Sequence, residues 1–307
     1  IDFYNIVRMI SMYKILSFYE FSDVSLDKVT KNKNKILEIS KNNSILGTII
    51  LSIEGINGTV SGPSKSIDSL SDLLFDLGYK CNVKFSTSTK KPFKRLKVKI
   101  QKEIVTFMNL AKSAKNTGTF ISPEDWDEFI SKDDVKLIDV RNFYETVIGK
   151  FPKSIDPNTQ TFTEFIDYID KELSSDKDQK IAMYCTGGIR CEKASSYMKD
   201  KGFKNIFQLE GGIINYLNKV EKEKGTWNGE CFVFDERVSL KYNSEVGNFE
   251  LCHGCRNPID EEDKKSIYFE EGVSCPNCIN VRSNEQNEKS RQRQAQIIFT
   301  EKRMGKL

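Results

Sequence analysis

A short run of residues around Cys185 constrains the fold more than any other part of this chain of 307 residues. Residues 180–184 are apolar and partly β-branched, which predicts a buried strand, whereas residues 191–201 carry apolar side chains at helical spacing. Gly187 and Gly188 lie between them and allow the backbone to turn so that its N–H groups surround the cysteine. The sequence therefore predicts a strand, a tight loop and a helix, with Cys185 at the junction.

The same loop predicts a reactive cysteine. Inward-pointing N–H groups and the positive end of the following helix favour the thiolate over the thiol. Arg190 adds a fixed positive charge, so we expect the pKa of Cys185 to lie below its ordinary value of about 8.5. The alternative is a buried, unreactive cysteine beside a glycine-rich turn. The expected loop residues between Cys185 and Arg190 are Thr186, Gly187, Gly188 and Ile189.

Strand and helix patterns alternate around this loop, which predicts an α/β domain with a mainly parallel sheet over residues 122–224. Sites in such sheets form beyond the carboxyl ends of the strands, where Asp139 and Arg141 are expected near Cys185. We expect Asp139 and Arg141 to shape the loop by hydrogen bonding rather than to transfer protons. Cys191 is expected either to pack into the domain or to act as a resolving thiol for Cys185.

Residues 12–115 are predicted to form a separate α+β domain. Its strand and helix patterns follow the order β-α-β-β-α-β, which is typical of a ferredoxin-like domain. Glycine and asparagine predict a turn over residues 54–58, and Ser64 is expected to cap the second helix. The expected strands cover residues 13–19, 47–53, 59–60 and 83–85, and the expected helices cover residues 26–40 and 64–77.

The stretch from residue 80 to residue 102 holds nine basic residues and no acidic one, although the whole chain has a net charge of only +3. Lys97 and Lys99 alternate with apolar residues, so a strand would place both on one face, and Phe93 is available to stack on a base. Clustered positive charge favours contact with a polyanion, and the alternative is a strand edge that lysines protect. The candidate RNA contacts are Lys90, Lys91, Lys94, Arg95, Lys97 and Lys99.

Residues 225–307 form a third predicted region, which has few periodic apolar residues and contains a C-x2-C-x19-C-x2-C pattern. Paired cysteines at this spacing predict a tetrahedral zinc site, and four thiolate ligands would leave no open position, so the metal would be structural. The basic tail over residues 282–306 is expected to be disordered or to form a second polyanion contact. The expected zinc ligands are Cys252, Cys255, Cys275 and Cys278.

The sequence also bears on the compartment. No window approaches 18 uninterrupted apolar residues, and the first residues lack a signal-peptide pattern, so we expect no membrane partner and a cytoplasmic location. Cysteines in a reducing compartment are ligands, catalytic groups or core residues rather than disulfides. The chain begins with Ile1 instead of Met, and we expect the natural start at Met9 or Met12.

Three segments of the predicted α/β domain resemble the rhodanese family: residues 137–145, 185–190 and 209–213. Rhodaneses carry sulfane sulfur as a persulfide on the loop cysteine, and the resemblance implies that role for Cys185. The four residues between Cys185 and Arg190 make this loop one residue shorter than the loop of cysteine-based phosphatases. A shorter loop leaves less room for a phosphoryl group.

Segments along nearly the whole chain are similar to the bacterial tRNA uridine hydroxylase family. They are residues 54–59, 185–195 and 229–238 and the two cysteine pairs. The similarity implies oxygen-dependent formation of 5-hydroxyuridine at the wobble position, with the tRNA anticodon loop as partner, molecular oxygen as co-substrate and Cys185 as the active cysteine. One departure is Lys150, where the family pattern has histidine.

The residues limit how such a hydroxylation could work. The chain has one histidine, His253, so an iron site of two histidines and a carboxylate is excluded within one chain. No G-x-G-x-x-G follows a strand, so a Rossmann-bound cofactor is unsupported, and an unidentified reductant must supply electrons. The alternative function is a sulfurtransferase that passes a Cys185 persulfide to a small molecule or carrier protein. A third possibility, an inactive scaffold that docks RNA or protein, is disfavoured by the intact Cys185 and Arg190.

Overall fold

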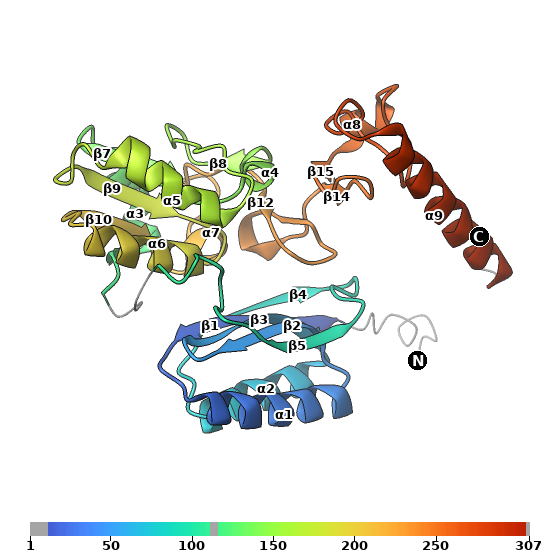
Figure 1. The fold of residues 1–307 in the computed structure, drawn as a ribbon, viewed down its shortest axis with the longest axis horizontal. Coiled ribbons are helices and arrows are strands. Elements are labelled where there is room, and N and C mark those ends of the chain that lie inside the picture. Colours follow the sequence, from blue (N-terminus) through green and yellow to red (C-terminus); the bar gives the residue numbers. More distant parts are fainter. Residues whose placement is uncertain (1–11, 111–115, 305–307) are drawn as a thin grey trace, which may run out of the picture. The chain divides into compact units, whose positions relative to one another are not determined.

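The computed structural model describes residues 12–110 and 116–304, so the expected start at Met9 lies outside the described residues. The chain divides into two compact units that meet between Glu245 and Val246. The first unit contains a five-stranded and a four-stranded sheet, and the second contains the cysteine pairs (Figure 1). The predicted combination of α+β and α/β folds is confirmed.

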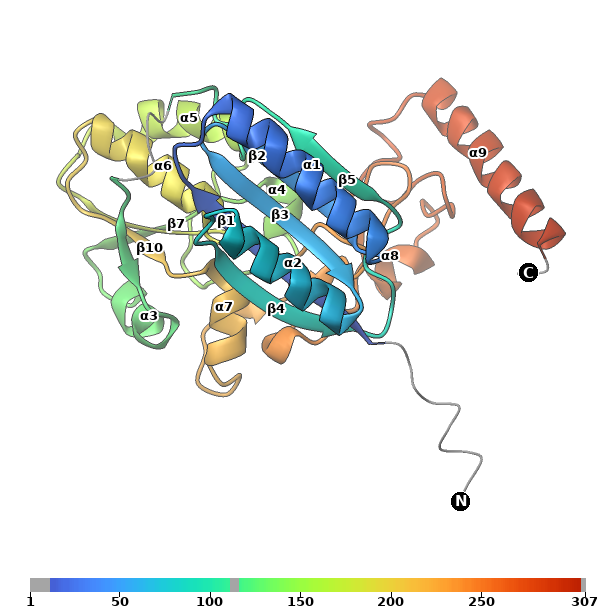
Figure 2. The same cartoon turned by 90° about the horizontal axis from the view of Figure 1, so that it is seen from below.

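The N-terminal sheet has the strand order β4-β1-β3-β2-β5. Its first four strands pair antiparallel in the order expected of a ferredoxin-like domain, and β5 adds a fifth strand parallel to β2. Helices α1 and α2 lie across one face of this sheet (Figure 2). The elements are β1 (Tyr13–Phe21), α1 (Leu26–Asn42), β2 (Leu46–Ser52), β3 (Gly55–Gly62), α2 (Ser64–Asp76), β4 (Asn82–Ser88) and β5 (Leu96–Ile100).

Two local expectations for this domain are wrong. Strand β3 already begins at Gly55, so the expected five-residue turn shrinks to the two residues before it. Gly55 can pair there because it has no side chain. A Cβ at this position would lie only 1.9 Å from the carbonyl oxygen of Glu20 on the neighbouring strand. Ser64 is the first residue of α2 and not its cap, since Pro63 precedes the helix without a capping side chain.

The two faces of the N-terminal sheet have different partners. Leu16 and Phe18 on β1 are buried in the core that α1 and α2 cover, whereas Ser17 and Tyr19 alternate with them and point to the other face. This second face carries more polar side chains. It is therefore free to contribute polar groups to a site without weakening the helix-covered core.

The second domain of the first unit has a parallel sheet in the order β6-β10-β9-β7. Its strands and main helices confirm the predicted α/β fold, but the helix expected over residues 162–173 is broken into a 3-10 turn, α5 and a π-helical turn. The elements are β6 (Thr119–Ile121), α3 (Pro123–Ile130), β7 (Val135–Asp139), α4 (Phe143–Thr146), β8 (Gly149–Lys150), α5 (Phe165–Tyr168), β9 (Lys180–Tyr184), α6 (Ile189–Asp200), β10 (Ile206–Leu209) and α7 (Gly212–Lys219).

Two short strand pairs complete the first unit. β11 (Asn228–Gly229) pairs with β8, and β12 (Cys231–Phe232) pairs with β13 (Ser239–Leu240). In the second unit the described part of the basic tail forms a helix instead of a disordered segment, because Ser283 and Gln286 form a capping box at its start. The elements of this unit are β14 (Glu250–Leu251), β15 (Pro258–Ile259), α8 (Glu261–Lys265) and α9 (Asn284–Arg303). Across the described residues, every helix is too short or too polar to span a lipid bilayer.

A buried ammonium group joins the two domains of the first unit. Lys193 on α6 donates to both carboxylate oxygens of Glu54, at 2.8 and 2.9 Å, and to Glu103 at 2.6 Å. It also donates to the carbonyl oxygen of Val105 at 2.9 Å. The neighbouring Glu192 accepts a hydrogen bond of 2.5 Å from Tyr19 on β1. Helix α6, which begins directly after the Cys185 loop, is thus fixed to the N-terminal domain; we call these contacts the α6 clamp.

The α6 clamp predicts that substitutions of Lys193 and Glu103 have strongly non-additive effects on the free energy of unfolding. Lys193→Met leaves the buried Glu103 carboxylate without its cation, so we expect a loss of about 3–5 kcal/mol in the free energy of unfolding. In the double variant with Glu103→Gln the buried Glu103 charge is removed too, and only the partly exposed Glu54 carboxylate lacks its cation. The loss should therefore be at least about 1 kcal/mol smaller than the sum of the two single losses. Denaturant unfolding followed by circular dichroism measures all three, and purely additive losses would contradict the clamp.

Candidate active site

The backbone of the Cys185 loop is oriented by the start of α7. The carbonyl oxygens of Cys185 and Thr186 accept hydrogen bonds from the N–H groups of Ile213 and Ile214, at 3.0 and 3.1 Å. These carbonyl groups point toward α7, and the Gly188 N–H points toward the cysteine. It donates a hydrogen bond to the Cys185 sulfur at 3.2 Å. The loop therefore forms a tight turn at its glycines, with the Gly188 N–H directed at the sulfur.

Position 188 requires glycine, both because of its backbone conformation and because a side chain would not fit. Its φ is +102°, and a Cβ at this position would lie 2.8 Å from the Tyr19 hydroxyl oxygen. Gly212 is similarly restricted, because its φ is +68° and a Cβ would lie 2.5 Å from the Cys185 carbonyl oxygen. These two glycines let the N-terminal sheet and α7 approach the loop from different sides.

Cys185 is fully buried, and its surroundings favour the thiolate. Burial by itself would raise the pKa of this thiol, but the Cys191 thiol donates a hydrogen bond to it and Arg190 adds positive charge. The N–H groups of Cys191 and Gly188 assist, and together these groups lower the pKa of Cys185 to about 5. Burial and the neighbouring Cys185 thiolate raise the pKa of Cys191 well above its ordinary value, so Cys191 stays protonated as a donor.

Arg190 is held by a carboxylate. Its guanidinium group donates to both oxygens of Glu145, at 2.5 and 2.8 Å, and both side chains are buried. Burial would raise the pKa of Glu145, but the charge and hydrogen bonds of Arg190 outweigh it and hold that pKa below its ordinary value. Arg190 therefore contributes positive charge near the sulfur, while its own hydrogen-bonding groups are largely committed.

Asp139 and Arg141 lie behind the loop. Arg141 is fully buried, pairs with Asp139 at 2.6 Å and donates to the carbonyl oxygens of Glu145 and Gly149, at 3.1 and 2.6 Å. Arg141 thereby fixes the segment that presents Glu145 to Arg190. Neither Asp139 nor Arg141 lines the cavity beside the loop.

A cavity of about 470 Å³ lies between the second face of the N-terminal sheet and the Cys185 loop. Its volume is within the range of small-molecule sites and is sufficient for a nucleobase. Polar side chains from the sheet face the loop across it, and aromatic rings from three other segments close it. We call this space the interdomain cavity, and the residues that matter below are Tyr19, Lys84, Phe93, Phe162, Cys185 and Phe234.

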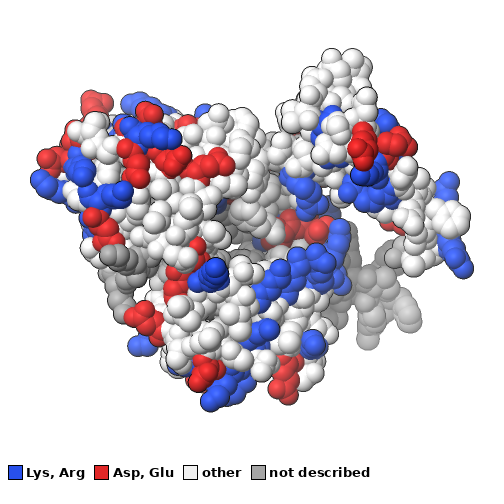
Figure 3. Space-filling view, viewed as in Figure 1, with Lys and Arg blue, Asp and Glu red and all other residues white. Residues whose placement is uncertain are grey.

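Two basic side chains of the predicted basic strand, β5, project from the same sheet face that lines the interdomain cavity. In the parallel pairing of β2 with β5, Lys97 is opposite Thr48 and Lys99 is opposite Ile50, and both β2 residues line the cavity. Basic side chains gather over the part of the N-terminal domain where β5 lies (Figure 3). Lys94 pairs with Glu236 at 3.0 Å. The exposed members of the candidate set are Lys90, Lys91, Lys94, Arg95 and Lys99, and Lys97 is half-buried.

Three residues that shape this site could not be assigned a role from the sequence: Tyr19, Lys84 and Glu145. Tyr19 and Lys84 come from the N-terminal domain and reach the Cys185 loop, and no local sequence signal distinguishes them from other strand residues. Glu145 was noticed only within the rhodanese-like segment. Its position at the start of α4, where it also caps Asn142, is the one signal that could have identified it as a fixed partner for an arginine.

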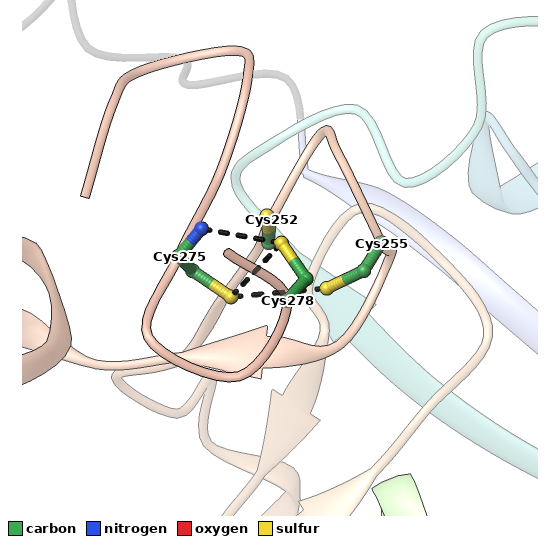
Figure 4. Close-up of side chains that lie close together, drawn as sticks. All are labelled: Cys252, Cys255, Cys275 and Cys278. Carbon is green, nitrogen blue, oxygen red and sulfur yellow. Dashed lines mark hydrogen bonds between the residues drawn. The ribbon is translucent and has the colours of Figure 1, made fainter. Parts of the chain in front are cut away.

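The second unit brings together the four cysteines of the paired pattern. The four sulfur atoms lie within 4.8 Å of one another; they belong to Cys252, Cys255, Cys275 and Cys278 (Figure 4). Cys255 and Cys275 are 3.7 Å apart at sulfur, and Cys275 and Cys278 are 3.8 Å apart. Zinc–sulfur bonds of about 2.3 Å in a tetrahedron require sulfur separations of about 3.8 Å, so this cluster could hold a metal ion.

Comparisons with known proteins agree with the two-domain architecture of the first unit. Residues 13–104 match the UPF0176 acylphosphatase like domain, and residues 122–219 match the rhodanese-like domain. A protein from Picosynechococcus named tRNA uridine(34) hydroxylase is 46% identical, over 87% of this chain and 90% of its own. A protein of the same name from Rhizobium etli is 42% identical, over 95% of this chain and 94% of its own. Another from Prochlorococcus marinus is 41% identical, over 94% of this chain and 95% of its own.

The geometry around Cys185 predicts a thiolate that forms at acidic pH. The ultraviolet thiolate absorbance of the protein, minus that of Cys185→Ser, should titrate with a midpoint near pH 5. Cys191→Ala removes a donor to the thiolate and should raise this midpoint by about one pH unit. Cys81→Ala is the control, because burial raises the pKa of Cys81 to about 12 and this thiol stays protonated in the range measured. A midpoint near or above pH 8 would contradict the thiolate assignment.

Proposed function

Because this chain belongs to the tRNA uridine(34) hydroxylase family, we propose that it hydroxylates uridine 34 of tRNA, at C5 of the base. The observation that carries the proposal for this site is the interdomain cavity, which is lined by Cys185 and its loop and by aromatic rings. Enzymes that modify a base move it out of the base stack into such a pocket. The free-energy cost of this unstacking is small in a single-stranded anticodon loop. The uracil of residue 34 fits the cavity in size.

Cys185 is the proposed active cysteine. It acts either as the thiolate that its surroundings stabilise or as a persulfide whose outer sulfur extends into the interdomain cavity, as in rhodaneses. Arg190 and the Gly188 N–H support the negative charge in both cases. Glu145, Asp139 and Arg141 keep this arrangement in place without touching the base.

Molecular oxygen is the proposed co-substrate. Hydroxylation places one oxygen atom on C5, and the second leaves as water after it takes two electrons and two protons. These electrons come from an external reductant, because each turnover consumes two of them. His253 is the single histidine of the chain, so a two-histidine iron site within one chain is excluded. The part of the protein in this step is to bind the base and to keep the sulfur reactive.

The proposed tRNA contact is the basic surface of β5 and the segment before it. Lys97 and Lys99 share the sheet face that forms the interdomain cavity, so phosphates bound along β5 would bring a loop nucleotide to the opening. Phe93 lines the cavity and can stack on a base, as the sequence suggested. The remaining proposed phosphate contacts are Lys90, Lys91, Lys94 and Arg95.

Zinc is the proposed metal of the cysteine cluster. The sulfur separations fit tetrahedral thiolate coordination, and Cys252, Cys255, Cys275 and Cys278 would hold the ion. With four protein ligands the metal supplies no open coordination site, so its contribution is to the stability of the small second unit. We also propose a cytoplasmic location, because all eight cysteines are unpaired and a reducing compartment preserves both a thiolate and a zinc site.

Nucleoside analysis of tRNA tests the function directly. Cells that lack this protein and any parallel pathway should lose wobble 5-hydroxyuridine derivatives, and wild-type protein should restore them. Cys185→Ala should restore less than about one hundredth of the wild-type level, because the reactive sulfur is gone. Mass spectrometry of digested tRNA measures both. Purified protein that transfers sulfur from thiosulfate rapidly but leaves tRNA unmodified would instead support the sulfurtransferase alternative.

Metal analysis tests the cysteine cluster separately. The purified protein should contain one zinc per chain, and Cys252→Ser should lose it and destabilise the second unit. Elemental analysis measures the metal, and proteolysis of residues 246–307 measures the stability. Cys231→Ser is the matched control, since Cys231 lies in the first unit and should leave the zinc content unchanged. A metal-free wild-type protein with a protease-resistant second unit would contradict the assignment.

A further inference from the structure

Lys84 reaches the Cys185 loop from the N-terminal domain. It lies on β4 opposite Ser17, on the sheet face that forms the interdomain cavity. Its ammonium group donates to the carbonyl oxygen of Gly187 at 3.0 Å and lies 5.4 Å from the ring centre of Tyr19. The side chain thus lines the cavity and touches the loop that holds the reactive sulfur.

Among the residues that the structure describes, Lys84 differs from the other cations near the site in having no carboxylate partner. Arg190 is paired with Glu145, and Lys193 is paired with Glu54 and Glu103. Within residues 12–110 and 116–304, no carboxylate lies within ion-pair distance of the Lys84 ammonium. Its bond to the Gly187 carbonyl uses one of three N–H donors, so donors remain for a ligand in the cavity. Lys84 is partly buried, and a cation shielded from solvent with unused donors is unfavourable unless a ligand or water satisfies it.

We propose that Lys84 is a catalytic and specificity-determining residue that donates a hydrogen bond to the C4 carbonyl oxygen of the uracil base. This inference rests on the proposed function, because it assigns a contact to the base that the interdomain cavity would take. Uracil presents an oxygen acceptor at this position, whereas cytosine presents an amino group. An ammonium group has donors only, so it accepts uracil and repels the cytosine amine.

The charged surroundings of Lys84 support this role. Burial lowers the pKa of Lys84 to about 8, while the negative charges of Cys185 and Glu192 oppose the shift. The third neighbour, Tyr19, stays neutral because burial and Glu192 raise its pKa. Lys84 is therefore protonated at neutral pH and loses its proton above about pH 8, and a contact that needs the ammonium form should weaken over that range.

Substitution at residue 84 tests the proposed contact. Lys84→Met should lower kcat/KM on a tRNA with uridine at position 34 by about 10–100-fold, the loss expected for one charged hydrogen bond. Lys84→Arg keeps a positive charge that does not titrate, so the activity it retains should no longer fall above about pH 8 as wild-type activity does. Lys65→Met, on α2 at the helix-covered side of the sheet, is the matched control and should match the wild type.

A binding experiment separates this proposal from the proposed function. Anticodon stem-loops with uridine or cytidine at position 34 are titrated into the inactive Cys185→Ala variant. We expect tighter binding of the uridine form, and loss of that preference when Lys84→Met is added. Equal loss of affinity for both stem-loops would make Lys84 a phosphate contact and overturn the proposal, as would wild-type kcat/KM in Lys84→Met. Absence of hydroxylation by the wild type would overturn the proposed function while leaving the binding preference measurable.

The same variants report on the loop itself. In Lys84→Met the thiolate absorbance of Cys185 should remain at pH 7, because Arg190, Cys191 and the loop N–H groups still stabilise it. Loss of that absorbance would mean that Lys84 acts through the sulfur rather than on the base, and would overturn the proposed contact.

Discussion

The buried ammonium group of Lys193 determines the form of this site. It is enclosed by Glu54, Glu103 and a carbonyl oxygen, and it belongs to the helix that begins at the reactive loop. An ammonium buried without these partners would be strongly unfavourable, so α6 is stable in its present environment only when the N-terminal domain is docked against it. The second wall of the interdomain cavity, with Tyr19 and Lys84, therefore exists because this charge is satisfied.

The sequence segments that distinguish this chain from an isolated rhodanese domain have a common location. The segment that contains Glu54 and the segment that contains Glu192 and Lys193 meet in the α6 clamp. The segment over residues 229–238 supplies Phe234 to the cavity, and its Arg237 donates to Ser86 on β4 at 3.0 Å. All three segments thus hold the N-terminal sheet close to Cys185.

The sequence predicted well the features that depend on neighbouring residues. Helical and strand periodicity located the order of elements in both sheets, and the glycines between β9 and α6 predicted the turn around Cys185, because these signals arise from local backbone preferences. Lys84 was counted only as one of nine basic residues, since its role depends on a contact with Gly187 about a hundred positions away. Arg190 is expected from the sequence to place positive charge near the sulfur, but the Glu145 carboxylate that holds it could not be foreseen, because that pairing depends on α4 lying beside the loop. Ser283 shows the opposite error, because a low apolar content suggested disorder where a capping box starts a helix.

The two walls of the interdomain cavity come from two domains of the first unit. The sulfur, its N–H donors and Arg190 come from the rhodanese-like domain, whereas the opposite wall comes from the ferredoxin-like sheet. Side chains on that wall can change without disturbing the hydrogen bonds that ionise Cys185, and the helix-covered core beneath them would remain intact. Such a division means that the substrate of the cavity can be changed through side chains of one wall, while the loop around the cysteine keeps its own structure.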